Sequence, residues 1–375
     1  MSESSADALT QEALSHWYVR LLANGVTYID ASEVIPRVTS WHAWCRLWME
    51  RAAIREREAR EMEEAGRNLS AAEAYMRASL AYHFAQFVYH EDLELKAEAQ
   101  KRKVAAYLRA APHLEPPAER VEIPWPGGRI LPGCLRIPEG AKGEGGAPCV
   151  VLIAGLDSTK EEFFTLEEVL HSRGLATFAF DGPAQGENAD MQLRPDFEGV
   201  VSVVMDHLVE DARLDPSRIG ALGVSLGGYY APRSLAFEPR LKAGVGVCGP
   251  YDMVEIWEGL PALTRQGVCV SFQTDDEEQG ALKSQEISLR GCLNGLDRPL
   301  LIIHGEKDRL CPVEQARKIA AEAGDACELV VYPEGVHVCN NIPFLWRPLA
   351  ADWLAGKLEV IGRGNGARRR PPLDS

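Results

Sequence analysis

A pentapeptide near the middle of the chain carries the clearest sign of chemistry. Gly223-Val224-Ser225-Leu226-Gly227 matches the pattern G-x-S-x-G, follows the apolar run Ile219–Val224 and precedes a helical pattern at Leu226–Phe237. A serine on such a strand-to-helix turn is held in a strained conformation that exposes its hydroxyl, and the glycines leave room for the bend. We therefore predict that Ser225 is a nucleophile. The alternative is a Gly/Ser turn without chemistry.

A serine nucleophile needs a base that takes its proton and a carboxylate that orients the base. Asp308 is the predicted carboxylate because it follows the apolar run Leu300–His304 and precedes the Leu310-Cys311-Pro312 turn. Glu306 is the second choice, and a purely structural role is the alternative for either. His337 lies in a glycine-bearing loop after the last predicted strand, and we predict that it is the base.

A metal site is a competing interpretation of the same region. His304 ends a predicted strand and is expected to be structural, although with Asp308 and His337 it could form a set of metal ligands. Ligand spacing of the H-E-x-x-H type is absent from the sequence. We therefore expect neither a metal nor a cofactor.

Attack on a carbonyl also requires backbone N–H groups that stabilise the developing oxyanion. One such donor is the residue after the nucleophile, which is Leu226. The second is expected in the loop Gly155-Leu156-Asp157-Ser158, where we choose Leu156. This loop lacks the HGGG run of many lipases, which disfavours a simple lipase.

The chain beyond residue 118 alternates between strand and helix patterns. Nearly continuous apolar runs predict buried parallel strands at Cys149–Ala154, Ala176–Phe180, Ile219–Val224, Ala243–Val247, Leu300–His304 and Leu329–Tyr332. An antiparallel pair is predicted at Val121–Trp125 and Arg129–Ile137. Helical patterns cover Lys160–Arg173, Asp196–Ala212, Leu226–Phe237, Val313–Ala323 and Leu345–Leu358. This alternation predicts an α/β fold with a mostly parallel sheet and helices on both faces.

The composition of the chain changes at Glu115-Pro116-Pro117, where two prolines end the helical pattern. We predict a helical N-terminal cap domain of about four helices over residues 1–118 and an α/β core over 119–360. We also predict a small helical insert over residues 251–296 and a flexible tail over 361–375. Six aromatic residues of the N-terminal segment could form a wall for a flat substrate or simply a helical core: Trp41, Trp44, Trp48, Tyr75, Tyr82 and Phe84.

Composition and charge exclude several classes of function. The 375 residues carry a net charge of −15, which disfavours binding to nucleic acid. No apolar window is long enough to span a membrane, and the N-terminus lacks a basic segment followed by an apolar one. The nine cysteines contain no Cys-x-x-Cys pair. We expect a cytoplasmic protein whose partner is a small-molecule substrate.

These landmarks together resemble the α/β-hydrolase superfamily. More narrowly, they resemble the branch that contains 2,6-dihydroxypseudooxynicotine hydrolase and the fungal pigment-pathway hydrolases that shorten polyketide chains. The resemblance spans most of the chain, including the helical module ahead of the core. It rests on residues 154–161, 181–187, 223–228, 238–240 and 335–341. The Asp157-x-x-Lys160-Glu161 and His337-x-Cys339-Asn340-Asn341 loops are its more discriminating parts.

The resemblance implies a catalytic triad of Ser225, Asp308 and His337, a substrate cleft walled in part by the N-terminal helices, and a homodimer. It also implies hydrolysis of a carbon–carbon bond beside a ketone through an acyl-serine, assisted by a carboxylate from the insert. Three acids lie in the matching region, Asp252, Glu255 and Glu258. We choose Glu255, with a solvated helix face as the alternative for all three.

Two other functions are compatible with the same residues. An esterase, thioesterase or acyltransferase acting on C–O or C–S bonds needs the same machinery with an easier leaving group. A catalytically inactive hydrolase fold that only binds a ligand would have no need for the three triad residues together. Turnover of simple p-nitrophenyl esters well above that of aryl ketones favours the first alternative, and failure of a fluorophosphonate to label Ser225 favours the second.

Overall fold

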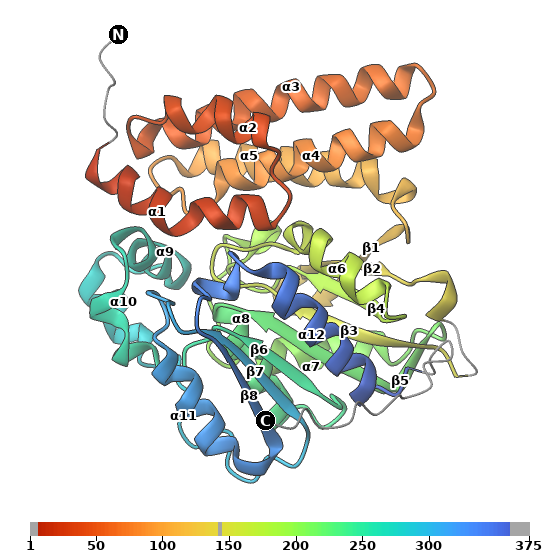
Figure 1. Cartoon of the computed structure of the whole chain (residues 1–375), viewed down its shortest axis with the longest axis vertical. Helices are drawn as coiled ribbons and strands as arrows, with labels where there is room; N and C mark the ends of the chain where they lie inside the picture. The colour runs from red at the N-terminus through yellow and green to blue at the C-terminus, as the bar shows by residue number, and fades with distance from the viewer. Residues whose placement is uncertain (1–6, 142–144, 361–375) are drawn as a thin grey trace, which may run out of the picture.

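The computed structural model describes residues 7–141 and 145–360, and the predicted tail at 361–375 lies outside the described residues. Figure 1 shows the two parts of the molecule: a layer of helices from the N-terminal third packs on an α/β part built from the rest of the chain. The boundary between them falls at a short segment before the first strand, where the sequence carries consecutive prolines.

The α/β part is built on one sheet of eight strands in the order β1-β2-β4-β3-β5-β6-β7-β8. The strands are β1 (Ala118–Trp125), β2 (Arg129–Arg136), β3 (Ala147–Ile153), β4 (Ala176–Phe180), β5 (Leu214–Val224), β6 (Gly244–Val247), β7 (Leu300–Gly305) and β8 (Cys327–Tyr332). β2 pairs antiparallel with both β1 and β4, and the remaining neighbours pair in parallel. The predicted α/β fold with a mostly parallel sheet is confirmed.

Both faces of this sheet are covered by helices, which explains why its central strands are apolar throughout. The helices are α6 (Phe164–His171), α7 (Glu198–Leu208), α8 (Leu226–Phe237), α11 (Val313–Ala323) and α12 (Pro343–Lys357). Alternate residues of β3 point to opposite faces: Val151 packs in the cluster with α7, α8 and α11, whereas Val150 packs in the cluster with α6 and α12. The carboxyl ends of the strands, where chemistry is expected in such sheets, lie toward the helical layer.

Over residues 7–110 the N-terminal layer contains five α-helices, where about four were expected. They are α1 (Ala8–Ala23), α2 (Tyr28–Val34), α3 (Trp44–Glu64), α4 (Asn68–Gln86) and α5 (Leu93–Ala110). Local caps fix several starts: the Asp7 carboxylate accepts from the Thr10 N–H at 2.8 Å, and Asp92 accepts from the Leu95 N–H at 2.9 Å.

The six aromatic residues considered as a substrate wall lie inside this helical layer. Trp44 and Trp48 are fully buried, and Trp41 stacks on Trp44 with ring centroids 4.6 Å apart. All six belong to the core cluster of the helical layer, and none lines the two cavities beside Ser225. The interpretation as plain helical core is therefore correct, and the substrate-wall interpretation is wrong for these residues.

The segment between β6 and β7 contains two short helices, α9 (Ala262–Phe272) and α10 (Glu277–Ser284), with 3₁₀ turns before them. These helices lie beside the α1 end of the N-terminal layer (Figure 1). Asp276 caps α10 by accepting from the Gln279 N–H at 2.8 Å. Among the helices of residues 7–141 and 145–360, none has both the length and the apolarity that a bilayer crossing requires.

Candidate active site

Ser225 lies on a strained turn between β5 and α8. Its backbone has φ 57° and ψ −121°, a region that residues with a Cβ rarely adopt. The turn is possible because its neighbours are glycines: a Cβ on Gly223 would lie 1.9 Å from the Gly227 carbonyl oxygen, and one on Gly227 would lie 2.1 Å from the Ile153 carbonyl oxygen. The G-x-S-x-G pattern thus reflects close backbone packing as well as a tight bend.

A substitution at Gly227 tests whether this close approach is required. We expect Gly227→Ala to lower the free energy of unfolding by about 1–3 kcal/mol or more, because the methyl group overlaps backbone that cannot rotate away. The matched control is Gly356→Ala in α12, where an added Cβ meets nothing within 4 Å; there we expect a change of about 1 kcal/mol at most, in the stabilising direction. Chemical denaturation of the two variants measures the difference, and equal stabilities would contradict the packing argument.

The structure brings the three predicted triad residues into hydrogen-bonding distance. His337 Nε2 lies 2.8 Å from Ser225 Oγ, and His337 Nδ1 lies 2.8 Å from Asp308 Oδ2. The Asp308 side chain is fully buried and that of His337 is 6% exposed. The three groups come from the ends of three strands, β5, β7 and β8, because parallel strands deliver their carboxyl ends to one edge of a sheet.

The environment of Asp308 keeps its carboxylate charged. Burial acts to raise its pKa, but the His337 ring, His304 and the Cys311 N–H together outweigh burial, and the net pKa lies below the ordinary value. The second oxygen accepts the backbone N–H groups of Leu310 and Cys311, each at 2.9 Å. Glu306, the other carboxylate considered, is half exposed and lies 3.9 Å from Arg317. The geometry therefore selects Asp308 as the partner of the imidazole.

His304 has a structural environment, as expected. Its Nε2 lies 2.6 Å from the Cys311 carbonyl oxygen, and burial lowers its pKa. Cys248, His304 and Asp308 could together approach a metal ion. The two Asp308 oxygens, however, already accept hydrogen bonds from His337 and from the backbone of the following turn. The Asp308 carboxylate therefore serves the triad in this arrangement and not a metal ion.

The loop after β3 lies directly against the nucleophile. A Cβ on Gly155 would lie 3.1 Å from Ser225 Cβ and 3.5 Å from Ser225 Oγ, so the loop backbone approaches the serine closely. Leu226 is the first residue of α8, where backbone N–H groups have no acceptor within the helix. These positions agree with the predicted oxyanion donors Leu156 and Leu226, which remain an assignment from position.

Two adjoining cavities lie at this edge of the sheet. A small one of about 60 Å³ is lined by Ser225 together with α1 residues, including Trp17 and Arg20. A larger one of about 630 Å³ lies against α5. Leu156, Asp157 and Ser158 line both cavities. The N-terminal helices therefore form part of the lining, in agreement with the implication of the family resemblance.

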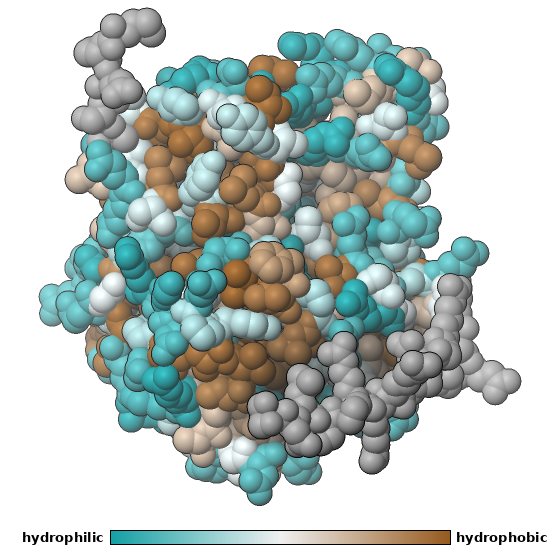
Figure 2. All heavy atoms as spheres, in the orientation of Figure 1, coloured by the Kyte–Doolittle hydropathy of each residue, from teal (hydrophilic) through white to brown (hydrophobic). Residues whose placement is uncertain are grey.

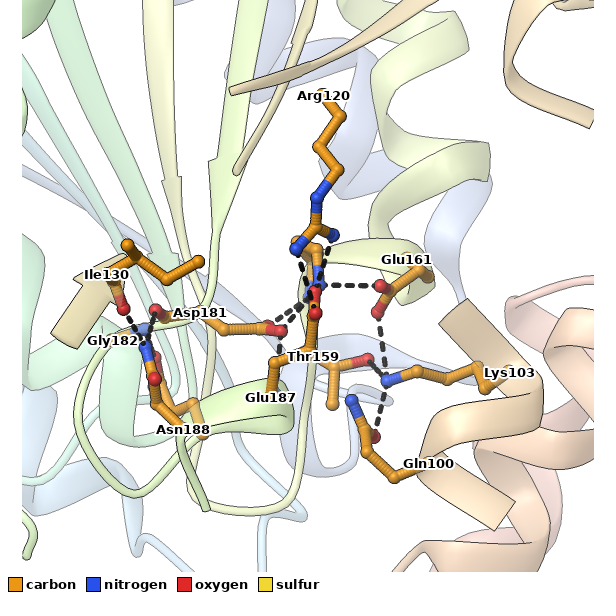
Figure 3. Close-up of polar contacts among 12 residues, drawn as sticks. Gln100, Lys103, Arg120, Ile130, Thr159, Glu161, Asp181, Gly182, Glu187 and Asn188 are labelled. Carbon is orange, nitrogen blue, oxygen red and sulfur yellow. Dashed lines mark hydrogen bonds and ion pairs between the residues drawn. The ribbon is translucent and has the colours of Figure 1, made fainter. Parts of the chain in front are cut away.

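The same loop is anchored by a buried cluster of charges, drawn in Figure 3. Lys160 Nζ lies 2.7 Å from Glu161 and from Asp181 and 2.6 Å from Glu187. Lys103 of α5 lies 2.9 Å from Glu161, and Arg120 of β1 lies 2.9 Å from Glu187. Three cations thus face three carboxylates between the helical layer and the sheet.

Lys160 takes the central position of this cluster. The oxygens of Glu161, Asp181 and Glu187 lie close enough together to hold a metal ion, but the Lys160 ammonium already lies within 2.7 Å of all three. Although burial acts to lower the Lys160 pKa, the three carboxylates raise it well above its ordinary value. The residues Asp157-x-x-Lys160-Glu161 therefore combine a cavity-lining residue with the anchor that fixes its loop.

The structure does not bring Glu255 to the serine. Its carboxylate lies at the surface, where it accepts hydrogen bonds from Arg290 at 2.7 Å, Gln315 at 2.8 Å and Lys318 at 2.5 Å. The hydrogen bond from Lys318 lowers its pKa, which opposes service as a proton donor. Asp252 is likewise paired with Arg290, and Glu258 is exposed. The choice of Glu255 as an auxiliary acid is corrected because its basic neighbours hold it outside both cavities.

The correction can be tested by neutralising the side chain. We expect Glu255→Gln to change kcat by no more than about twofold on any substrate, because exposed substitutions away from a site shift free energies by only about 0.5 kcal/mol. Steady-state rates of the variant and the parent protein measure this. A loss of tenfold or more on a ketone, with ester turnover intact, would restore Glu255 as an auxiliary acid.

Two residues of the site gave no signal in the sequence. Trp17 of α1 packs its ring edge-on against His337, with centroids 6.3 Å apart. Arg20, one turn later, forms a buried ion pair with Glu162 of the loop that follows β3. Both belong to a helix more than two hundred residues before Ser225, and only the packing of the helical layer on the sheet brings them together.

The chain is similar to several known hydrolases. The family model described as FrsA-like, esterase FrsA-like, matches residues 33–337. The chain is 35% identical over 339 residues to the 2,6-dihydropseudooxynicotine hydrolase of Paenarthrobacter nicotinovorans, covering 89% of this chain and 90% of that protein. It is also 35% identical over 227 residues to a 20-hydroxy-prefusarin hydrolase of Gibberella moniliformis, which covers 57% of this chain and 54% of that one.

The solved structures show the same likeness at the level of the fold. The crystal structure of a 2,6-dihydroxy-pseudo-oxynicotine hydrolase superposes with a TM-score of 0.82 at 35% identity, over 92% of this chain and 95% of that one. The matched region includes the N-terminal helices as well as the sheet, since it spans nearly the whole of both chains. The architecture is therefore shared over most of both chains.

Proposed function

Because the chain belongs to the FrsA-like family of α/β-hydrolases, we propose that it is a serine hydrolase that cleaves a carbon–carbon bond beside a ketone in an aromatic or polyketide-type substrate. The observation that carries the proposal is the contact of Ser225 Oγ with a histidine that is itself held by a buried aspartate. The carbon–carbon specificity is supported by the relative that is 35% identical over nine-tenths of both chains and is described as a dihydropseudooxynicotine hydrolase.

The proposed reaction begins with proton transfer. His337 takes the proton of Ser225, and the serine oxygen attacks the ketone carbonyl to form a tetrahedral oxyanion. The backbone N–H groups of Leu156 and Leu226 stabilise that oxyanion. Collapse breaks the bond to the neighbouring carbon, whose electron pair must be delocalised into a ring or an adjacent carbonyl, and a proton neutralises the departing fragment. Once His337 has lost its own proton, it activates a water that hydrolyses the acyl-serine and returns the enzyme to its starting state.

The cavities support a substrate of some size. The space beside Ser225 is small, whereas the adjoining space of about 630 Å³ has the volume of a drug-sized ligand site. An acyl fragment at Ser225 and a larger departing fragment in the second cavity would use both. This arrangement favours a bulky ketone over a short-chain ester.

A panel of matched substrates tests the proposal. Aryl ketones and β-diketones are compared with p-nitrophenyl esters that carry the same acyl groups. We expect turnover of the ketones to exceed their spontaneous cleavage by at least about 10⁶-fold. Ester turnover without detectable ketone cleavage would contradict the carbon–carbon specificity.

An esterase is the second candidate, because the matching family model is described by that activity. It uses the same triad, with His337 returning the serine's proton to an oxygen or sulfur leaving group. The panel separates the two functions directly, since both substrate types produce the same acyl-serine.

A homodimer is proposed as the assembly. Exposed apolar side chains occur on α1, α2 and the start of α12, with Tyr28 80% exposed and Phe344 70% exposed. Figure 2 shows apolar areas over the helical layer and over the α/β part of the same face. Sedimentation equilibrium is expected to give twice the mass of the 41.3 kDa chain, and a monomer at micromolar concentration would contradict the assignment.

A further inference from the structure

Asp157 is a largely buried carboxyl group that the triad does not use. Its side chain is 11% exposed and lines both cavities, one position after Leu156. Across the described part of the chain its side chain makes no hydrogen bond and one ion-pair contact, to His90, whose Nε2 lies 3.7 Å from Asp157 Oδ1, beyond hydrogen-bonding distance. Buried carboxylates in proteins are normally held by several hydrogen bonds. The oxygens of Asp157 are instead left free to meet a ligand in the cavity.

Two further groups form a row with Asp157 along the larger cavity. Lys96 Nζ lies 3.3 Å from His90 Nδ1. Because an ammonium can only donate, this contact places the hydrogen of a neutral His90 on Nε2, the nitrogen that faces Asp157. That nitrogen is buried and has no hydrogen-bond partner among residues 7–141 and 145–360. Lys96, His90 and Asp157 therefore form a row. Lys96 is at one end, and at the other is the carboxyl group of Asp157, which lines the same small cavity as Ser225.

The electrostatic environment shifts the pKa of each of these groups in the direction that favours its neutral form. Burial raises the pKa of Asp157 above its ordinary value, although Lys96 and Arg20 oppose the shift. Burial also lowers the pKa of Lys96 and, together with Lys96, that of His90. The charged and titratable groups that face Asp157 are His83, His90, Lys96, Arg20 and Glu162. A carboxyl group with a raised pKa is suited to donate a proton rather than to accept one.

The location of the row fits a requirement of carbon–carbon cleavage. When the tetrahedral intermediate collapses, the electron pair moves onto an enolate or phenolate oxygen that lies two or more bonds from the broken bond. His337 is held at the serine by a 2.8 Å contact, whereas Asp157 borders the space that the departing fragment would occupy. A donor at this position reaches a charge that the triad histidine does not.

Building on the carbon–carbon hydrolase function proposed above, we propose that Asp157 is the proton donor to the departing fragment and that the larger cavity binds that fragment as an enol or phenol. In the step, the bond between the acyl carbon and its neighbour breaks, its electron pair moves to the enolate oxygen, and the Asp157 O–H transfers its proton there. The acyl group stays on Ser225 Oγ.

The proton balance closes through solvent. The Asp157 carboxylate left by the step takes a proton back from solvent in the larger cavity, which it lines. The protonated His337 loses its proton to solvent before it activates water for deacylation. The net reaction consumes one water and yields an acid and a protonated leaving fragment. His90 and Lys96 are positioning residues in this scheme.

The test compares Asp157→Asn with the parent protein on a β-diketone and on the p-nitrophenyl ester of the same acyl group. Both substrates produce the same acyl-serine, so any difference arises in its formation. We expect kcat on the diketone to fall about 10²–10⁴-fold, as for loss of a general acid, and kcat on the ester to change less than about threefold. The control is Asp325→Asn, which removes the charge of an exposed carboxylate that is distant from Asp157 in the sequence. It should leave both rates unchanged.

The pH profile supplies a readout that a structural role would not change. An acid must be protonated to act, so the diketone rate of the parent protein should fall as pH rises through the Asp157 pKa, whereas the ester rate should not. Asp157→Glu should restore part of the diketone rate and that limb of the profile. Equal losses on both substrates, or no loss on the diketone, would overturn the proposed role of Asp157 but leave the carbon–carbon function standing. Absence of diketone cleavage by the parent protein, with ester turnover present, would overturn the carbon–carbon function and this role with it.

Discussion

Ser225→Ala is expected to lower kcat about 10⁴–10⁶-fold on every substrate that the protein hydrolyses, because the variant has no oxygen to form the acyl intermediate. His337→Ala should cause a loss of the same order, since the serine hydroxyl then has no base within reach; its Nε2 lies 2.8 Å from Ser225 Oγ. Single-turnover assays with an active-site titrant measure both variants against a background of uncatalysed hydrolysis.

The two triad losses should not add. The serine and the histidine act as one unit, so the double variant is expected to be about as slow as either single variant. Ser32→Ala in α2, whose hydroxyl donates to the Ile29 carbonyl, serves as a control and should retain full activity. Retention of most activity by Ser225→Ala or by His337→Ala would refute the assignment of the triad.

Lys160→Met is expected to cause the largest loss of stability among single substitutions in the cavity loop. It leaves Glu161, Asp181 and Glu187 around a group without charge, and their side chains are at most 25% exposed. Glu161 and Glu187 keep Lys103 and Arg120, but Asp181 loses the only cation that the described residues place beside it. Removing one partner from a buried ion pair typically costs about 3–5 kcal/mol, because the remaining charge is left uncompensated. Urea denaturation followed by circular dichroism measures the free energy of unfolding.

An exposed lysine provides the comparison. Lys283 forms an ion pair with Glu286 one helical turn away at the surface, where Lys283→Met should cost less than about 1 kcal/mol. The loss at Lys160 should also shrink at low pH. The three carboxylates need a cation only while they are ionised, and protonation removes their mutual repulsion. A stability of Lys160→Met equal to that of Lys283→Met would show that the cluster is not needed to hold the loop.

Much of the fold follows from patterns that the sequence displays locally. The buried strands appear as unbroken apolar runs because helices cover both faces, and Leu226–Phe237 and Val313–Ala323 were bounded as observed. Other boundaries differ for physical reasons. β5 begins at Leu214, five residues before the predicted strand, because Leu214 pairs with the start of β3. The residues between Leu214 and Ile219 are polar and turn-forming, so the sequence shows no strand pattern there. The stretch Lys160–Phe163 is a 3₁₀ segment instead of the start of α6, since its charged side chains turn inward to the ion cluster.

The residues of the site likewise fall into those that a local sequence pattern reveals and those that it does not. Ser225, Asp308 and His337 were recognisable because each follows a strand in a loop with a distinctive local pattern. Trp17, His90 and Lys96 carry no such pattern, because they reach the site from helices whose docking depends on long-range packing. Glu255 was chosen by position along the chain, and its basic partners Arg290 and Lys318 come from segments that local reasoning does not place beside it.

The most direct test of the proposed chemistry is the intact mass of the protein during ketone turnover. The protein is mixed with an aryl ketone or β-diketone, quenched in acid within milliseconds, and examined by mass spectrometry with peptide mapping. We expect a mass increase equal to the acyl fragment, located on the peptide that contains Ser225 and absent from Ser225→Ala. Steady ketone cleavage with unmodified protein, or with the acyl group on another residue, would contradict the account.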